Sequence, residues 1–545
     1  ELSLAQMAML AGLPKAPSAY NPLANPERAK IRRDWILGRM RDLEYISEDA
    51  WELATSAPIT AEYNSPSREV DADYVAEMAR NEMVERYGDA AYNDGYKVTV
   101  TIDSRKQQAA TDALRAGLEA YDRRHGFRGP IGTVDQDQLT PDNLENLMAN
   151  YRSVGPLVPA VVTAVNDDAG LTTLYARNLG PVEMPFEAMK WARRHKTENL
   201  TGPQPEKPSD VLSPGNVVYV KSAEPATTGD QDTATESVNG EQVISAVPQV
   251  RLAQLPNVQG ALISLNAGNG AIESLAGGYS FSYNKYNRAT QALRQPGSTF
   301  KPFLYLSALE KGLTPATMFN DAPIVFDDDE LETAWRPQNS SGQFYGPTRL
   351  REALYSSRNL VSIRLLRDLG IPYVLDYLEQ LRIPTENMQK DLSLSLGSGQ
   401  LTPIQLARGF AVIANGGYNV TPYLIQTIFC EGEEDCAHKA EENLASKITL
   451  PSGQSQQEET PDRDVRLAER LADKRSVYIL HSMMQDVIKR GTGRRALALG
   501  RSDIAGKTGT TNNQRDAWFA GFNTRIATAA WVGFDNSSPL GRGEY

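Results

Sequence analysis

Arg294-Gln295-Pro296-Gly297-Ser298-Thr299-Phe300-Lys301-Pro302 joins a turn signal to the start of a helix. The turn is Pro296-Gly297, and an apolar helical pattern then runs to Gly312, a residue type that often follows the end of a helix. If the helix begins at Ser298, the serine hydroxyl and the Lys301 amine lie on one face, one turn apart. The segment therefore predicts a nucleophile beside a candidate base.

The chemistry of this pair requires more than spacing. A serine hydroxyl is a weak nucleophile unless a base removes its proton. Lysine, with an ordinary pKa of about 10.4, is a base near neutrality only when it is desolvated or lies near another cation. Backbone N–H groups at the helix start would stabilise negative charge developing at Ser298. The spacing alone is a weak signal, because Ser282-Tyr283-Asn284-Lys285 shares it in a segment that we predict to be a loop.

Composition limits the class of protein. A chain of 545 residues, 41% apolar and 23% charged, is typical of about three soluble globular domains. The net charge of -12 argues against nucleic acid as the main partner. No apolar run of about 18 residues predicts a membrane span, and no signal peptide opens the sequence. Because the sequence does not begin with Met, we expect a fragment of something longer.

Two cysteines, Cys430 and Cys436, flank an acidic loop. Their proximity favours a local disulfide in an oxidising compartment over two free thiols in a reducing one, and both readings stay open. The four histidines form no metal motif and no Ser-His-Asp hydrolase motif. We therefore expect neither a metal nor a cofactor.

The order of patterns along the chain predicts an α+β multidomain protein. Residues 1–57 have helical patterns, and a helix, a strand and a helix follow at 71–87, 96–103 and 104–124. Short β-patterned runs separated by polar stretches are typical of a small OB-like β-barrel; they lie at 158–165, 171–177, 216–221 and 243–250. From Val258, strands open and close a domain with helices between, which predicts one antiparallel sheet covered by helices.

Two further motifs follow the serine–lysine pair. Ser357-Arg358-Asn359 starts a helical pattern, and Lys507-Thr508-Gly509-Thr510-Thr511 lies on a predicted strand. The glycine would let an extended substrate approach the strand, whose lysine and hydroxyls could hold a carboxylate. In this order, Ser-x-x-Lys, Ser-x-Asn and Lys-Thr-Gly resemble the signature of the serine penicillin-recognising enzymes.

The resemblance extends along essentially the whole chain to class A penicillin-binding proteins of the Gram-negative 1a type. It is carried by residues 1–22, which are similar to the tail of that family's glycosyltransferase domain, and by residues 295–302, 394–399, 402–403, 414–417, 506–511 and 531–535. It implies a glycosyltransferase remnant at 1–62, a linker region at 63–149, an OB-like domain at 150–255 and a transpeptidase domain at 256–545. The implied transpeptidase fold is β-lactamase-like, with a helix-covered antiparallel sheet.

The resemblance also implies a reaction, the cross-linking of peptidoglycan stem peptides that end in D-Ala-D-Ala. Ser298 would attack the penultimate carbonyl with Lys301 as base, and Ser357 with Lys507 would pass a proton to the leaving D-Ala. The backbone N–H groups of Ser298 and Thr510 would form the oxyanion hole. The implied substrate-binding residues are Asn359, Thr508, Gly509, Thr510 and Thr511.

Partners and location are implied in the same way. They are peptidoglycan stem peptides, the lipid-linked precursor, β-lactam antibiotics and cell-wall regulatory proteins at the OB-like domain. The protein would act at the periplasmic face of the inner membrane, anchored by a segment absent from this sequence. The full-length protein would also polymerise glycan; this fragment, which lacks the catalytic glutamate motif, would not. It is also expected to stop before a terminal helix of the family.

Rival functions remain. A carboxypeptidase or serine β-lactamase could use the same three motifs and pass the acyl group to water. A non-catalytic scaffold would use Ser298 only as a helix cap.

Overall fold

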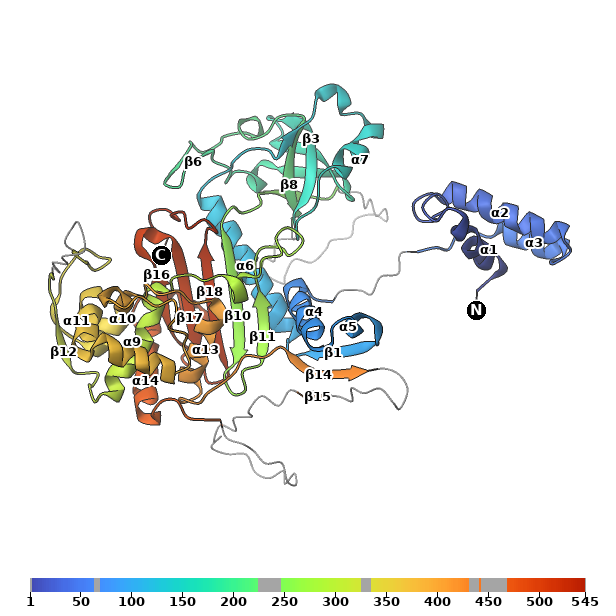
Figure 1. Ribbon diagram of the computed structural model, residues 1–545. Coiled ribbons are helices and arrows are strands. Elements are labelled where there is room, and N and C mark those ends of the chain that lie inside the picture. Colours follow the sequence, from blue (N-terminus) through green and yellow to red (C-terminus); the bar gives the residue numbers. More distant parts are fainter. Residues whose placement is uncertain are drawn as a thin grey trace, which may run out of the picture. The chain divides into compact units, whose positions relative to one another are not determined.

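The computed structural model describes residues 2–62, 69–223, 247–324, 335–430, 441–442 and 468–544. The chain divides into two compact units, Glu1–Glu69 and Val70–Tyr545. Figure 1 shows both units, with many of their helices and strands labelled. Each unit is described by itself below.

The first unit is helical, as predicted. Its helices are α1 (Leu4–Gly12), α2 (Pro26–Asp42) and α3 (Glu48–Ser56). Ser3 and Ser47 cap α1 and α3 by accepting hydrogen bonds from backbone N–H groups in the first turn. Small buried side chains let the helices approach closely, and the core is formed by Ala5, Ala8, Leu37 and Ala54.

The second unit begins with a helical segment that leads to the sheets. Its elements are α4 (Asp73–Tyr87), α5 (Ala90–Asn93), β1 (Tyr96–Val100) and α6 (Ser104–Arg124). Strand β1 pairs with β14 (Ile425–Cys430), which pairs with β15 (Glu441–Glu442). The strand predicted at 96–103 is therefore shorter, and it ends before Asp103 caps α6.

A six-stranded antiparallel sheet forms the next part. In sheet order its strands are β2 (Gly132–Thr133), β8 (Asn216–Ser222), β3 (Val158–Asn166), β4 (Leu171–Ala176) and β5 (Gly180–Pro185). A sixth strand, β9 (Val250–Ala253), pairs with β8. The run predicted at 243–250 lies mostly outside the described residues, and β9 begins where it ends. Helix α7 (Pro141–Ala149) and the β6 (His195–Thr197)–β7 (Leu200–Thr201) pair complete this part.

The last part of the chain contains a five-stranded antiparallel sheet, as predicted from the strands at both ends of this domain. In order its strands are β11 (Ile272–Ala276), β10 (Gln259–Asn266), β18 (Ile526–Gly533), β17 (Asp516–Phe522) and β16 (Ala505–Thr510). Strand β10 pairs with β18 over its whole length, so the two ends of the domain meet in the middle of the sheet. This arrangement leaves β16 at one edge.

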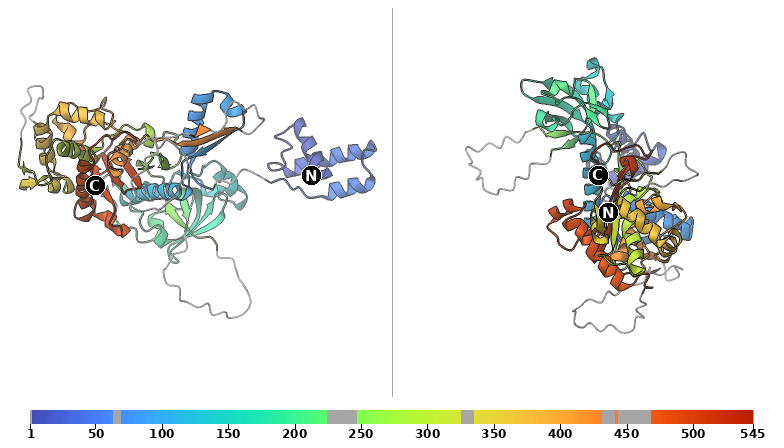
Figure 2. Two further views of the ribbon diagram at one scale, coloured as in Figure 1. Left: turned by 90° about the horizontal axis from the view of Figure 1, so that it is seen from below. Right: turned by 90° about the vertical axis from the view of Figure 1, so that its left-hand side faces the viewer.

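Helices cover both faces of this sheet (Figures 1 and 2). On one face α6 packs so closely that a Cβ atom at Gly260 would lie 2.8 Å from Leu114 of that helix. The next residue on β10, Ala261, faces the other side and belongs to the main core. That core includes α9 (Lys301–Glu310), α13 (Pro403–Ala414) and α14 (Lys474–Lys489).

Smaller elements complete this domain. They are α8 (Arg288–Gln291), β12 (Met318–Asp321), β13 (Gly346–Arg349), α10 (Leu350–Tyr355), α11 (Asn359–Leu369) and α12 (Ile371–Gln380). Across the ranges given above, no helix combines the length and the apolar character needed to cross a lipid bilayer.

Candidate active site

The Ser298 segment differs in one respect from the predicted helix start. Residues Gly297–Phe300 form a turn of 3-10 helix, and the α-helix α9 begins at Lys301. Gly297 has φ of 53° and its N–H donates to the carbonyl of Gly397 at 3.2 Å, so the turn is tied to a neighbouring loop. Ser298 is half-buried, and within the described part of the chain its hydroxyl has no hydrogen-bond partner. The proposed nucleophile is thus available to a substrate.

Strand β17 holds the residues just before this turn. The indole N–H of Trp518 donates to the carbonyl of Gln295 at 2.8 Å. Arg294 forms an ion pair with Asp516 at 2.9 Å, with both side chains at most about one tenth exposed. The sheet therefore fixes both the backbone and the side chain that lead into Ser298.

The Lys301 amine is fully buried and lies against the second motif. Its Nζ atom donates to the Asn359 Oδ1 atom and to the Ser357 carbonyl, both at 2.8 Å, and lies 3.3 Å from the Ser357 hydroxyl. Burial is the main cause that lowers the pKa of Lys301 well below its ordinary value, and the positive charge of Lys507 adds to it. A lysine whose pKa is lowered in this way is a better proton acceptor candidate than an exposed lysine, because its neutral form is more accessible.

The Lys507 amine reaches the same serine from β16. Its Nζ atom lies 2.9 Å from the Ser357 hydroxyl and 2.8 Å from the Thr508 carbonyl. The side chain is 0% exposed, and burial lowers the pKa of Lys507 to about 7. Two lysines from different elements therefore meet at one hydroxyl group.

Ser357 itself has an unusual backbone. It links α10 to α11 with φ of 57°, a left-handed conformation that a serine adopts at some cost in free energy. The next N–H, that of Arg358, donates to the Ala353 carbonyl at 2.8 Å, which closes α10 as a glycine-like C-cap would. This conformation belongs to the residue whose hydroxyl lies between the two lysines.

The Lys-Thr-Gly strand lies directly against the Ser298 turn. A Cβ atom at Gly509 would lie 2.5 Å from the Pro296 carbonyl oxygen, so a glycine is needed for this contact as well as for any substrate. The Thr508 hydroxyl lies 2.6 Å from that of Thr492. Thr510, the other half-buried threonine of the strand, lies next to the turn, since a Cβ atom at Gly297 would be 2.7 Å from its carbonyl oxygen.

Thr511 differs from the other predicted substrate-binding residues. It is 8% exposed, and its hydroxyl donates to Asp516 at 3.1 Å and accepts the Asp516 N–H at 2.9 Å. These contacts hold the connection between β16 and β17. The structure therefore brings Lys301, Ser357, Asn359 and Lys507 together through hydrogen bonds, whereas the Thr511 hydroxyl is bound to Asp516.

Three side chains near the site were not predicted from the sequence. Thr492 lies beside Thr508, and Asn339 hydrogen-bonds both to Asp321 and to the backbone of Asn359. These three residues, Thr492, Asn339 and Asp321, lie in segments without a periodic hydrophobic pattern. The only feature of the sequence that could have pointed to any of them is the polar composition around Asn339. Cys436 falls outside the described residues, and so does the disulfide predicted between it and Cys430. Among the described residues, no group of three His, Cys, Asp or Glu side chains could hold a metal ion.

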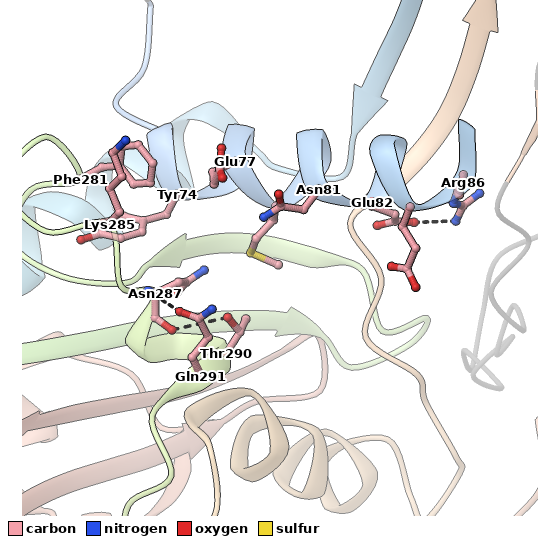
Figure 3. A pocket seen from close by; sticks show the side chains of 12 residues that line it. Tyr74, Glu77, Asn81, Glu82, Arg86, Phe281, Lys285, Asn287, Thr290 and Gln291 are labelled. Atoms are coloured by element: carbon pink, nitrogen blue, oxygen red, sulfur yellow. Dashed lines mark hydrogen bonds and ion pairs between the residues drawn. The ribbon is translucent and has the colours of Figure 1, made fainter. Parts of the chain in front are cut away.

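A separate pocket of about 670 Å³ lies between α4 and residues 281–291 (Figure 3). Polar side chains from both sides line it, among them Glu77, Asn81, Asn287 and Gln291. It contains none of the predicted site residues. The cluster of lysines and Ser357 is therefore the site that the three sequence motifs point to.

Comparison with known families matches the parts of this chain separately. The penicillin-binding protein transpeptidase domain matches residues 260–535, and the penicillin-binding protein OB-like domain matches residues 127–258. The transglycosylase family matches residues 1–41.

Individual relatives match nearly the whole chain. Penicillin-binding protein 1A of Pseudomonas aeruginosa is 44% identical over 100% of this chain, and that of Escherichia coli is 36% identical over 98%. The chain spans 66% and 65% of the length of these two relatives, slightly less than two thirds. The crystal structure of penicillin-binding protein 1A from Haemophilus influenzae is similar over 100% of this chain and 78% of its own, with 33% identity and a TM-score of 0.81.

Proposed function

This chain belongs to the class A penicillin-binding proteins of the 1A type, and from that premise we propose that it is a serine DD-transpeptidase of peptidoglycan. The observation that supports this most is the meeting of two buried lysine amines at the Ser357 hydroxyl, next to the turn that carries Ser298. Buried lysines with lowered pKa values suit proton transfer, which is what acyl transfer to and from a serine needs.

In the first step, the Ser298 Oγ atom attacks the carbonyl carbon of the penultimate D-Ala of a stem peptide. The neutral Lys301 amine takes the hydroxyl proton, and the backbone N–H groups of Ser298 and Thr510 hold the developing oxyanion. When the C–N bond breaks, Ser357 donates a proton to the leaving D-Ala amine and is resupplied by Lys507 or Lys301. The products are an ester on Ser298 and free D-Ala.

Substrate would lie along β16, because that strand is an edge of the sheet and its other neighbour is the Ser298 turn. Thr508 and Thr510 would bind the terminal carboxylate, with Gly509 allowing close approach. Asn359 would hold the substrate amide through its side chain while it orients Lys301. Thr511 would support this surface from behind through Asp516.

In the second step, an amine of a neighbouring stem peptide attacks the ester and forms the cross-link. A β-lactam would be attacked in the same way, but its leaving nitrogen stays tethered to the acyl group, so Ser298 would remain acylated. The proposal extends to the whole protein, which would also polymerise glycan from the lipid-linked precursor at the periplasmic face of the inner membrane. Regulatory proteins would bind its OB-like domain.

The test is intact-mass analysis after incubation with benzylpenicillin, comparing the parent with Ser298→Ala. Ser282→Ala is the matched control, because Ser282 and Lys285 have the same sequence spacing in a loop. We expect one stable adduct that is lost only in Ser298→Ala. Rapid hydrolysis of the antibiotic would favour a β-lactamase, and the absence of any adduct on folded protein would favour a scaffold.

The substrate is tested by D-Ala release from an acylated peptide ending in D-Ala-D-Ala. The matched peptide ending in D-Ala-L-Ala should release nothing. With an added amine acceptor, a mass corresponding to the cross-linked product should appear, whereas release into water alone would indicate a carboxypeptidase.

A further inference from the structure

Asn339 is a buried residue between β12 and β13, and both the nitrogen and the oxygen of its side-chain amide form hydrogen bonds. Its Nδ2 atom donates to both carboxylate oxygens of Asp321, each at 2.9 Å, and lies 2.9 Å from the Gln343 carbonyl. Its Oδ1 atom accepts the backbone N–H of Asn359 at 2.8 Å. The side chain is 5% exposed. Turning the amide over would place its oxygen against the Asp321 carboxylate and its NH₂ group against the Asn359 N–H, so the hydrogen bonds fix its orientation.

The hydrogen bond from the Asn359 N–H to Asn339 caps helix α11, whose own N-cap residue provides no side-chain acceptor. Helix α11 begins at Asn359, and Arg358, at its N-cap position, supplies no side-chain cap. The first N–H groups of a helix have no partner within the helix. Asn339 provides the missing acceptor from 20 residues away, and the Asn359 Nδ2 atom in turn donates to the Gln338 carbonyl at 2.9 Å. Backbone and side chain of Asn359 are thus both fixed by the same loop.

The same residue leads to the proposed base. The Asn359 Oδ1 atom accepts from the Lys301 amine at 2.8 Å, so an unbroken series of hydrogen bonds runs from Asp321 through Asn339 and Asn359 to Lys301. Asp321 is 0% exposed, and its negative charge acts on the Lys301 amine. The other charged groups that act on Lys301 are Lys507 of β16 and Arg358 of the turn before α11.

We propose that Asn339, held by the carboxylate of Asp321, is a positioning residue of the acyl-transfer site. It fixes the turn at residues 357–359, and through it the Ser357 hydroxyl and the Lys301 amine, without touching the substrate. The inference rests on the function proposed above. It adds to the three motifs a fourth element, the buried Asp321–Asn339 pair.

The first experiment measures the rate constant for acylation by a fluorescent penicillin, separately from the affinity of the initial complex. Asn339→Ala should lower the acylation rate constant about 10- to 100-fold with little change in affinity, because a small displacement of reacting groups has this effect. Asp486→Asn is the control: it removes another buried, ion-paired carboxylate of the same domain and should leave acylation unchanged.

A rescue experiment distinguishes positioning from general loss of stability. Asn339→Asp keeps the acceptor for the Asn359 N–H but puts a carboxylate against Asp321, so acylation should fall. In the double variant Asp321→Asn with Asn339→Asp, the new amide at 321 can donate to the new carboxylate at 339. Acylation should then recover at least about fivefold over Asn339→Asp alone.

The pH profile gives a third readout. The charge of Asp321 opposes the lowering of the Lys301 pKa, so Asp321→Asn should lower that pKa further and move the acidic limb of the acylation profile to lower pH. Unchanged rates and pH profile in folded Asn339→Ala and Asp321→Asn would overturn the inference. If Asn339→Ala does not fold, the swapped pair and Asp321→Asn decide in the same way. A parent protein that is not acylated at all would instead refute the proposed function.

Discussion

The Lys507 amine lies 2.9 Å from the hydroxyl of Ser357, a residue held at φ of 57°. Neither the buried amine nor the left-handed serine is a favourable element of a stable fold. Lys301 contacts the same residue, and neither lysine has a hydrogen-bonded carboxylate partner among the described residues. The buried amines and the left-handed serine thus lower the stability of the fold, and the packing of the surrounding core compensates for them. Substitutions that remove one of these features should stabilise the protein while they reduce its activity.

Lys507→Met should raise stability at pH 7. Burial lowers the folded-state pKa of Lys507 from 10.5 to about 7, so between these pH values the unfolded chain binds more protons and stability of the parent falls as pH falls. After subtraction of the two lost hydrogen bonds, the gain in the free energy of unfolding at pH 7 should be roughly 1–3 kcal/mol. By pH 10 the gain should disappear, because little of the penalty for burying the charged amine remains there. Urea unfolding at both pH values measures it.

The control for this prediction is Lys311→Met, which removes an exposed lysine just after α9. Because this side chain is exposed, its removal should not give the stabilisation expected for Lys507→Met at pH 7. A Lys507→Met protein that is less stable than the parent at pH 7 would show that the buried amine is better solvated than its surroundings indicate.

Ser357→Gly and Ser357→Ala separate the hydroxyl from the backbone. Both remove the group between the lysines, so each should slow acylation by about 100-fold or more. Glycine adopts φ of 57° without a Cβ conflict, whereas alanine does not, so the glycine variant should be more stable by about 1 kcal/mol. Thermal unfolding and penicillin labelling of the two proteins test both parts. Equal stability would indicate that the turn relaxes.

Much of the fold was predictable because its signals are local. The helices and the strands that open and close the last domain follow from periodicity and end signals. The order of the three motifs also indicated that Lys301, Ser357 and Lys507 would share a site, and they lie within hydrogen-bonding distance. Periodicity does not fix helix ends, and α9 begins at Lys301 rather than at Ser298.

The rest depends on contacts between distant residues that leave no pattern in the sequence. Asn339 lies in a loop and accepts the hydrogen bond of the first N–H group of α11. The sequence around Arg358, the N-cap residue of α11, does not indicate that a distant side chain provides this cap. The left-handed conformation of Ser357 was not foreseen either, because such positions normally carry glycine. Tertiary contacts impose both features, so they become visible only when the fold is known.

Gly509→Ala should disable the site through packing. The added Cβ atom would lie 2.5 Å from the Pro296 carbonyl oxygen and 3.0 Å from the Thr299 nitrogen, and neither backbone atom can move freely. Overpacking of this kind typically reduces stability by about 1–3 kcal/mol. Acylation should fall with it, because β16 and the Ser298 turn must separate. Gly117→Ala on α6, where no atom lies within 4 Å of the new Cβ, should be neutral or slightly stabilising.

Arg294→Met should destabilise the protein by roughly 3 kcal/mol, because it leaves the buried Asp516 carboxylate without its ion-pair partner. Asp516 retains the Trp531 indole N–H at 2.9 Å and the Thr511 hydroxyl at 3.1 Å, so adding Asp516→Asn should recover part of the loss by removing the unpaired charge. Acylation by penicillin should remain slow in both proteins, since the guanidinium that anchors the segment before Ser298 is gone in each. Urea unfolding measures stability, and the rate of penicillin labelling measures acylation. If stability recovers and acylation does not, the unpaired charge of Asp516 explains the loss of stability, and the missing Arg294 side chain explains the slow acylation.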